Sequence, residues 1–73
     1  MEFKTLRSRI FYLSGLYGLE WLTTSYFIKK YAGVHSRQWV WMALTKEGTA
    51  IELKKEIAEH LDGIEVKENK RGK

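Results

Sequence analysis

The chain has 73 residues, of which 44% are hydrophobic and 30% are charged, and this length allows one small domain. It contains no cysteine and only two histidines, which excludes disulfides and a thiolate metal site, so we expect no metal and no cofactor. The net charge of +4 favours a polyanionic partner without requiring one.

Residues 10–28 are about as long as a membrane span, and basic residues flank them on both sides. They include Glu20, two glycines and several serines and threonines. A charged residue near the centre of a span costs about 2.5–3.5 kcal/mol. We therefore expect no membrane span, and a cytoplasmic location.

No proline interrupts the chain, and glycines divide it into segments of helical length, which predicts an all-α fold. The first segment carries a helical stripe of apolar residues and ends at Gly15, a natural helix stop. This stripe consists of Phe3, Leu6, Ile10 and Leu13. The second segment runs from about Leu19 to Ala32, although each hydroxyl residue at positions 23–25 is an alternative cap for a later start.

The third segment begins at Ser36, a good N-cap, and ends near Lys46. Residues 39–44 are nearly all apolar, and their Trp-Val-Trp run equally suits a strand. The short length of the segment and its capping residue favour a helix.

The fourth segment begins with Thr49 and Glu52, which have the spacing of a capping box. Its apolar stripe predicts a helix that ends at Gly63, with His60 on the outer face. The stripe consists of Ala50, Leu53, Ile57, Leu61 and Ile64. We therefore expect a single helical domain over residues 1–64 and a basic, flexible tail over residues 65–73.

The second and third segments together have the layout of a helix-turn-helix, with residues 32–34 as the turn. Ser36, Arg37 and Gln38 form the polar start of the second helix, which reaches base edges in the major groove. Arginine typically reads guanine and glutamine reads adenine. The residues expected to lock the first helix are Phe27, Ile28 and Tyr31, and those expected to face the core from the second are Val40, Ala43 and Leu44.

Residues 33–44, followed by Gly48-Thr49, Leu53 and residues 57–61, resemble the lambda-repressor-like family of small phage repressors and Cro proteins. The resemblance implies a compact bundle of four to five helices, binding to double-stranded operator DNA as a homodimer, and transcriptional repression. The base contacts implied are Ser36, Arg37, Gln38 and Trp41, and the phosphate contacts expected are Lys29, Lys30, His35 and Lys46.

Several alternatives remain open at this point. If Trp39 packs inward, Val40 turns outward and the polar helix start at residues 36–38 rotates with it. Which of Trp39 and Trp41 is the buried residue is therefore open. No nucleophile with a base, phosphate loop or carboxylate pair supports catalysis, so we expect no enzyme and no small-molecule substrate. The rival functions are a small protein-interaction module or inhibitor with an aromatic surface and, third, a membrane-associated peptide built on residues 10–28. A repressor, an activator and an excisionase-type role are not distinguished.

Overall fold

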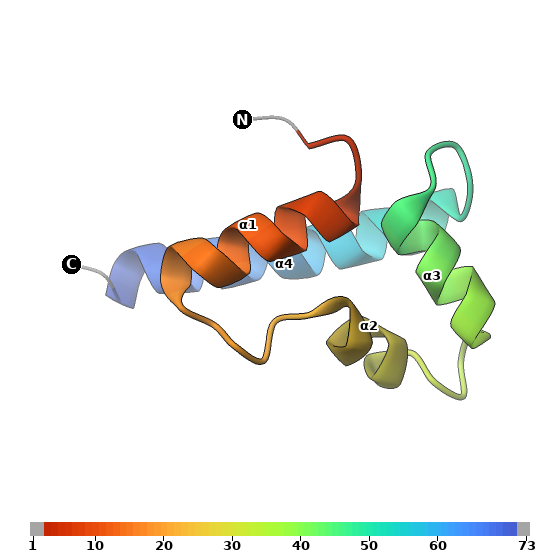
Figure 1. Cartoon of the computed structure of the whole chain (residues 1–73), viewed down its shortest axis with the longest axis horizontal. Helices are drawn as coiled ribbons and strands as arrows, with labels where there is room; N and C mark the ends of the chain where they lie inside the picture. The colour runs from red at the N-terminus through yellow and green to blue at the C-terminus, as the bar shows by residue number, and fades with distance from the viewer. Residues whose placement is uncertain (1–2, 72–73) are drawn as a thin grey trace.

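The computed structural model describes residues 3–71, and this part of the chain forms four helices and no strand (Figure 1). The helices are α1 (Leu6–Tyr17), α2 (Thr24–Lys30), α3 (Arg37–Thr45) and α4 (Ile51–Arg71). The long helices α1 and α4 lie side by side and run in the same direction, while α2 and α3 pack at one side and one end of this pair. The all-α fold predicted from the sequence is confirmed.

Three of the helices begin at a hydroxyl residue that caps them. The side-chain oxygens of Thr5, Thr23 and Ser36 each accept a hydrogen bond of 3.1 Å from the backbone N–H three residues later. Each bond satisfies one of the N–H groups that a helix start leaves without a partner. The expected cap at Ser36 is confirmed, and Thr23 is the cap among the three alternatives for α2.

The expected end of the first helix at Gly15 is wrong, because α1 continues to Tyr17 and ends at Gly18. Gly18 has a φ of 66°, the left-handed conformation that a terminating residue often adopts and that glycine adopts without steric cost. The following loop is held by Ser14, whose hydroxyl donates to the Leu19 carbonyl at 2.8 Å. Leu19 and Leu22 contribute to the core from this loop without being helical, and α2 begins only at Thr24.

The capping box expected at the start of α4 is absent. The hydroxyl oxygen of Thr49 is buried and makes no hydrogen bond, and Ala50 has a φ of 50°. Ala50, which directly precedes α4, therefore lacks the extended backbone of the other three caps. Because the Thr49 hydroxyl makes no hydrogen bond, its side chain does not cap the helix either. The Thr49 carbonyl instead accepts a hydrogen bond of 2.7 Å from the Lys54 ammonium group.

The expected end of α4 at Gly63 is also wrong, because the helix continues through residues 64–71. Residues 1–2 of the expected domain and residues 72–73 of the expected tail lie outside the described part of the chain. Contacts with α1 hold the last part of α4. The Arg9 guanidinium lies 2.5 Å from the Asp62 carboxylate and 3.2 Å from that of Glu65, and the Tyr17 hydroxyl donates to Asn69 at 2.7 Å. Two of these three contacts lie beyond Gly63, which explains why the glycine does not end the helix.

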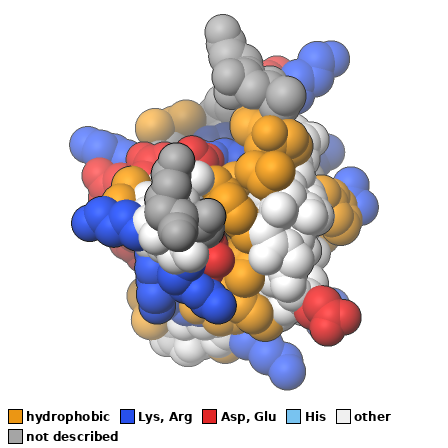
Figure 2. Space-filling model, turned by 90° about the vertical axis from the view of Figure 1, so that its left-hand side faces the viewer, with side chains coloured by type: hydrophobic (Ala, Val, Ile, Leu, Met, Phe, Trp, Pro, Cys, Tyr) orange, Lys and Arg blue, Asp and Glu red, His pale blue; other side chains and the backbone are white. Residues whose placement is uncertain are grey.

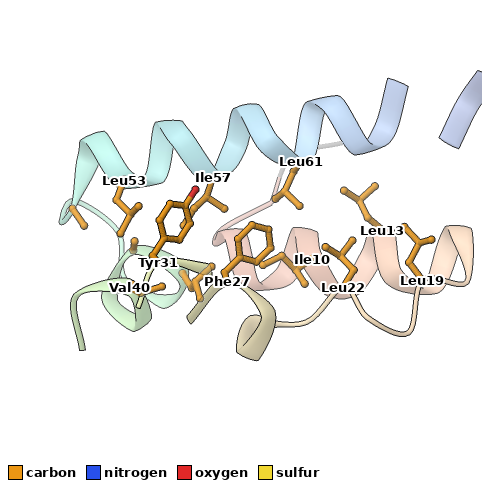
Figure 3. Close-up of a cluster of buried hydrophobic side chains, with 13 residues drawn as sticks. Ile10, Leu13, Leu19, Leu22, Phe27, Tyr31, Val40, Leu53, Ile57 and Leu61 are labelled. Atoms are coloured by element: carbon orange, nitrogen blue, oxygen red, sulfur yellow. The ribbon is translucent and has the colours of Figure 1, made fainter. Parts of the chain in front are cut away.

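One hydrophobic core joins all four helices, and its side chains meet between α4 and the other elements (Figure 3). The apolar stripe predicted for α4 is confirmed through Leu53, Ile57 and Leu61. Within residues 3–71 the buried residues of the core are Ile10, Leu13, Leu19, Leu22, Phe27, Tyr31, Val40, Ala43, Leu44, Ala50, Leu53, Ile57 and Leu61.

His60 was expected on the outer face of α4, and this expectation is wrong. Its ring stacks on Tyr26, with centroids 6.1 Å apart, and meets the Phe27 ring edge-on at 5.5 Å. Its Nε2 atom is buried and has no hydrogen-bond partner. Burial, and to a smaller extent the charge of Lys30, lowers the pKa of His60 below its ordinary value of 6.5.

We predict that the free energy of unfolding falls as the pH drops below about 6.5. The unfolded chain takes up a proton on His60 near that pH, whereas the folded chain resists protonation until the pH is lower. Stability is therefore complete above about pH 7.5, and this loss levels off below the folded-state pKa. Chemical denaturation of the wild type and of His60→Phe between pH 5.5 and 7.5 tests this, with a flatter profile expected for the variant. An equal pH dependence in both proteins would contradict the assignment.

The two glycines Gly63 and Gly18 give a second prediction, because their backbones differ. A Cβ added to Gly63 meets no atom within 4 Å, so Gly63→Ala should stabilise the helix by about 0.5–1 kcal/mol. Gly18→Ala should destabilise by about 1–2 kcal/mol, since an L-residue is strained at its positive φ. Thermal or urea unfolding measures both, and a destabilised Gly63→Ala would show that this position tolerates no side chain.

Candidate nucleic-acid interface

The orientation of α3 is fixed by three side chains that are completely buried. Val40, Ala43 and Leu44 are each 0% exposed, as the sequence pattern predicted. Neither tryptophan is buried, since Trp39 is 41% and Trp41 is 42% exposed. The alternative in which Trp39 packs inward and turns Val40 outward is therefore wrong, and the opposite face of α3 points to solvent.

The polar start of α3 lies on this exposed side. Arg37 and Gln38 are exposed, and Arg37 takes part in no ion pair within residues 3–71. Ser36 is exposed as well, and its oxygen accepts from the Trp39 N–H, which leaves its O–H proton available to donate. Three of the predicted base-contacting residues thus lie together at the capped start of α3. These residues, Ser36, Arg37 and Gln38, form the tip of α3.

The turn between α2 and α3 contains six residues, 31–36, which is longer than the turn of about three to four residues typical of a helix-turn-helix. The Tyr31 carbonyl organises it by accepting from the N–H groups of Val34 at 3.1 Å and His35 at 2.9 Å. Gly33 follows with a φ of 90°. The Tyr31 ring is buried, and burial together with Glu56 of α4 raises the pKa of Tyr31 to about 12. This turn, the linker between α2 and α3, is therefore anchored in the core by its first residue, Tyr31.

The four residues expected to contact phosphates lie at two places. Lys29 and Lys30 are exposed in the last turn of α2, and His35 is half-buried in the linker, so these three precede the tip of α3. His35 lines a cavity of about 230 Å³ together with Trp39 and the start of α4. Lys46 is exposed at the opposite end of α3, roughly 14 Å from the tip at 1.5 Å per residue.

The charges of the chain are divided unevenly between α4 and the rest. Residues 3–46 contain seven lysines and arginines and one acid, Glu20, whereas residues 47–71 contain five lysines and arginines and seven acids. Counting charges by segment reveals this division from the sequence, and the expectation based on net charge alone missed it. The half of the molecule that carries α3 is therefore the half suited to a polyanion.

A further basic residue, Arg7 of α1, lies next to α3. Its guanidinium carbon is 5.0 Å from the centre of the Phe11 ring and 6.0 Å from that of the Trp41 ring. Arg7 and Trp41 are far apart in the sequence, and no local pattern predicts their contact. The candidate interface thus includes a residue that sequence reasoning did not identify.

The opposite end of the molecule, where α1 and α4 finish, has a different surface. Figure 2 shows acidic and basic side chains mixed there beside a band of hydrophobic ones. Within residues 3–71 no group of three His, Cys, Asp or Glu side chains is placed to hold a metal ion. No helix in this range combines the length and apolar character needed to cross a membrane, and residues 10–28 are divided between α1 and α2.

Comparisons of the chain with protein-family models, curated protein sequences and solved structures found no match. The helix-turn-helix interpretation therefore rests on the residues of α2, the linker and α3 themselves.

Ser36 provides a test of how the tip is held. Ser36→Ala removes the acceptor for the Trp39 N–H and should destabilise the fold by about 1 kcal/mol, whereas Ser36→Asp retains an acceptor and should stay close to the wild type. Urea unfolding measures the difference. Equal stability of Ser36→Ala and the wild type would mean that the cap contributes nothing to α3.

Proposed function

We propose that this chain is a sequence-specific regulator that binds double-stranded DNA through insertion of the start of α3 into the major groove. The observation that carries the proposal is the orientation of α3. Its apolar residues Val40, Ala43 and Leu44 are fully buried, while Arg37 and Gln38 stand free at its exposed start. The charge distribution supports the same face, because one acid accompanies seven basic residues in residues 3–46.

The size and chemistry of α3 suit the groove. A helix with side chains is about 10–12 Å across, and the major groove is about 12 Å wide. In this mechanism the Arg37 guanidinium donates two hydrogen bonds to the O6 and N7 atoms of a guanine. The Gln38 amide pairs with the N6 and N7 atoms of an adenine, and the Ser36 hydroxyl donates to a neighbouring base acceptor.

Basic residues on either side of the tip hold the DNA backbone. Lys29, Lys30 and His35 contact phosphates on the side where α2 ends, and Lys46 contacts the other side of the groove. The separation of roughly 14 Å along α3 between its start and Lys46 is close to the width of the groove. These contacts supply affinity and orientation without reading the sequence.

The protein acts in this proposal as a homodimer on paired half-sites, because one helix of nine residues supplies few base contacts for operator-grade affinity. Its role is transcriptional repression, as in the lambda-repressor-like proteins that its sequence resembles, in the nucleoid of the cell.

The test is selection of bound sequences from random duplex DNA, followed by affinity measurements on the enriched duplex. Enrichment of a defined sequence is expected, with affinity that falls steeply as salt increases. Arg37→Ala and Gln38→Ala should each weaken binding by about 5- to 150-fold, corresponding to about 1–3 kcal/mol per bidentate base contact, and relax the preference at one position.

Lys67→Ala is the matched control, since Lys67 is exposed on α4 and its loss removes one positive charge, as Arg37→Ala does. This control should keep the sequence preference. Binding without any enriched sequence, or a preference unaffected by changes at both Arg37 and Gln38, would contradict the proposal.

A second candidate is a protein-interaction module, and the exposed hydrophobic residues favour it. Phe11, Leu16 and Val66 are each more than half exposed, and Trp21 is nearly so. Such side chains are typical anchors of protein interfaces. A chain that enriches no DNA sequence and binds DNA independently of salt would shift the assignment to this class.

A further inference from the structure

Arg7 stands in an aromatic setting at the junction of α1 and α3. Its guanidinium lies over the ring of Phe11, one helical turn further along α1, and near the ring of Trp41 on α3. Phe11 is 56% and Trp41 is 42% exposed, so the group is at the surface and open to a partner. Its place beside Trp41 puts the charge on the flank of α3, one turn beyond the tip at residues 36–38.

The charge of Arg7 is not neutralised within residues 3–71, in contrast with that of Arg9. Arg9 pairs with the carboxylates of Asp62 and Glu65 and thereby joins α1 to α4. Arg7 is exposed, lies against aromatic rings of α1 and α3, and forms no ion pair in the described part of the chain. Two arginines of one helix thus have different roles, since one serves the fold and the other remains available.

Stacking prepares this guanidinium for a particular kind of ligand. An arginine over aromatic faces has fewer conformations to lose on binding, while the edge that carries its N–H donors stays free. This edge matches two oxygens of a phosphate, and binding in this way is more directional than contact with a lysine.

We infer that Arg7 binds a phosphate of the DNA backbone beside α3, and that Phe11 and Trp41 hold its side chain in position. The inference rests on the proposed function. A phosphate fits better than a base because Arg7 belongs to α1 and lies beside α3 rather than at its tip. A phosphate also fits better than an acidic protein surface, because Arg7 continues the basic half of the molecule that carries Lys29, Lys30 and Arg37.

Trp41 then has a different role from the one expected from the sequence. The sequence placed Trp41 among the base-contacting residues, whereas its contact with Arg7 makes it a positioning residue for the phosphate contact. Loss of the indole should therefore act through Arg7 and leave the sequence preference unchanged.

The experiment measures affinity for the enriched duplex as a function of salt for the wild type, Arg7→Gln, Arg7→Lys and Arg71→Gln. Arg7→Gln should reduce the slope of log K against log salt by about 0.9. The affinity that the variant loses relative to the wild type should therefore be roughly 8-fold larger at 0.1 M salt than at 1 M salt. The slope should be retained in Arg7→Lys. Arg71→Gln makes the same chemical change on exposed α4 and should leave the slope unchanged.

A double-mutant cycle tests the positioning role. Trp41→Ala should weaken binding in the wild type and have little effect in the Arg7→Gln background, because its contribution passes through the guanidinium. Circular dichroism confirms that each variant is folded. Equal effects of Trp41→Ala in both backgrounds would overturn the role assigned to Trp41.

The outcomes separate the inference from the proposed function. If the wild type enriches a DNA sequence but Arg7→Gln keeps its salt slope, the inference alone is wrong. If Arg7→Gln alters the base preference, Arg7 contacts a base and the phosphate assignment is overturned. If the wild type binds no DNA, the proposed function fails and the inference fails with it.

Discussion

The burial of one side of α3 is the constraint on which the rest of the molecule depends. Helix α3 packs against α1, α2 and α4, and its residues Val40, Ala43 and Leu44 are completely buried, which leaves a single rotation for the helix. Figure 3 shows Val40 among the core side chains. The tip at residues 36–38 consequently faces solvent, and both tryptophans remain at the edges. A substitution that overfills this contact, or that leaves a cavity in it, would change the direction of the tip even if the chain still folds.

Helix α4 provides the support for this arrangement, and its charges explain how the two halves of the molecule differ. Its apolar stripe shares one core with α1, α2 and α3. Two of its acids, Asp62 and Glu65, form ion pairs with Arg9, which belongs to the otherwise basic half. The other basic residues of that half form no ion pair within residues 3–71. Arg9 of α1 thus stabilises the fold, whereas Arg7 of the same helix is the arginine assigned to DNA in the proposal.

Features set by neighbouring residues were predictable from the sequence, and features set by distant contacts were not. The cap at Ser36 and the buried stripe of α4 follow from local spacing, and the structure contains both. Gly15 and Gly63 were expected to end helices, but a glycine lowers helix stability by only about 1 kcal/mol, and α1 and α4 hold each other beyond it. The contact of Arg7 with Trp41 joins two helices far apart in the sequence, and no local pattern encodes it.

The assignment of α3 as the DNA-reading helix is tested most directly by amide chemical-shift mapping of the isotope-labelled protein during titration with the enriched duplex. We expect the shifts to concentrate in the end of α2, the linker, the start of α3 and the first turn of α1 around Arg7. Residues at the end of α4 should change little. Shifts centred on the hydrophobic band where α1 and α4 finish, with α3 unaffected, would contradict the claim that α3 is the DNA-reading helix.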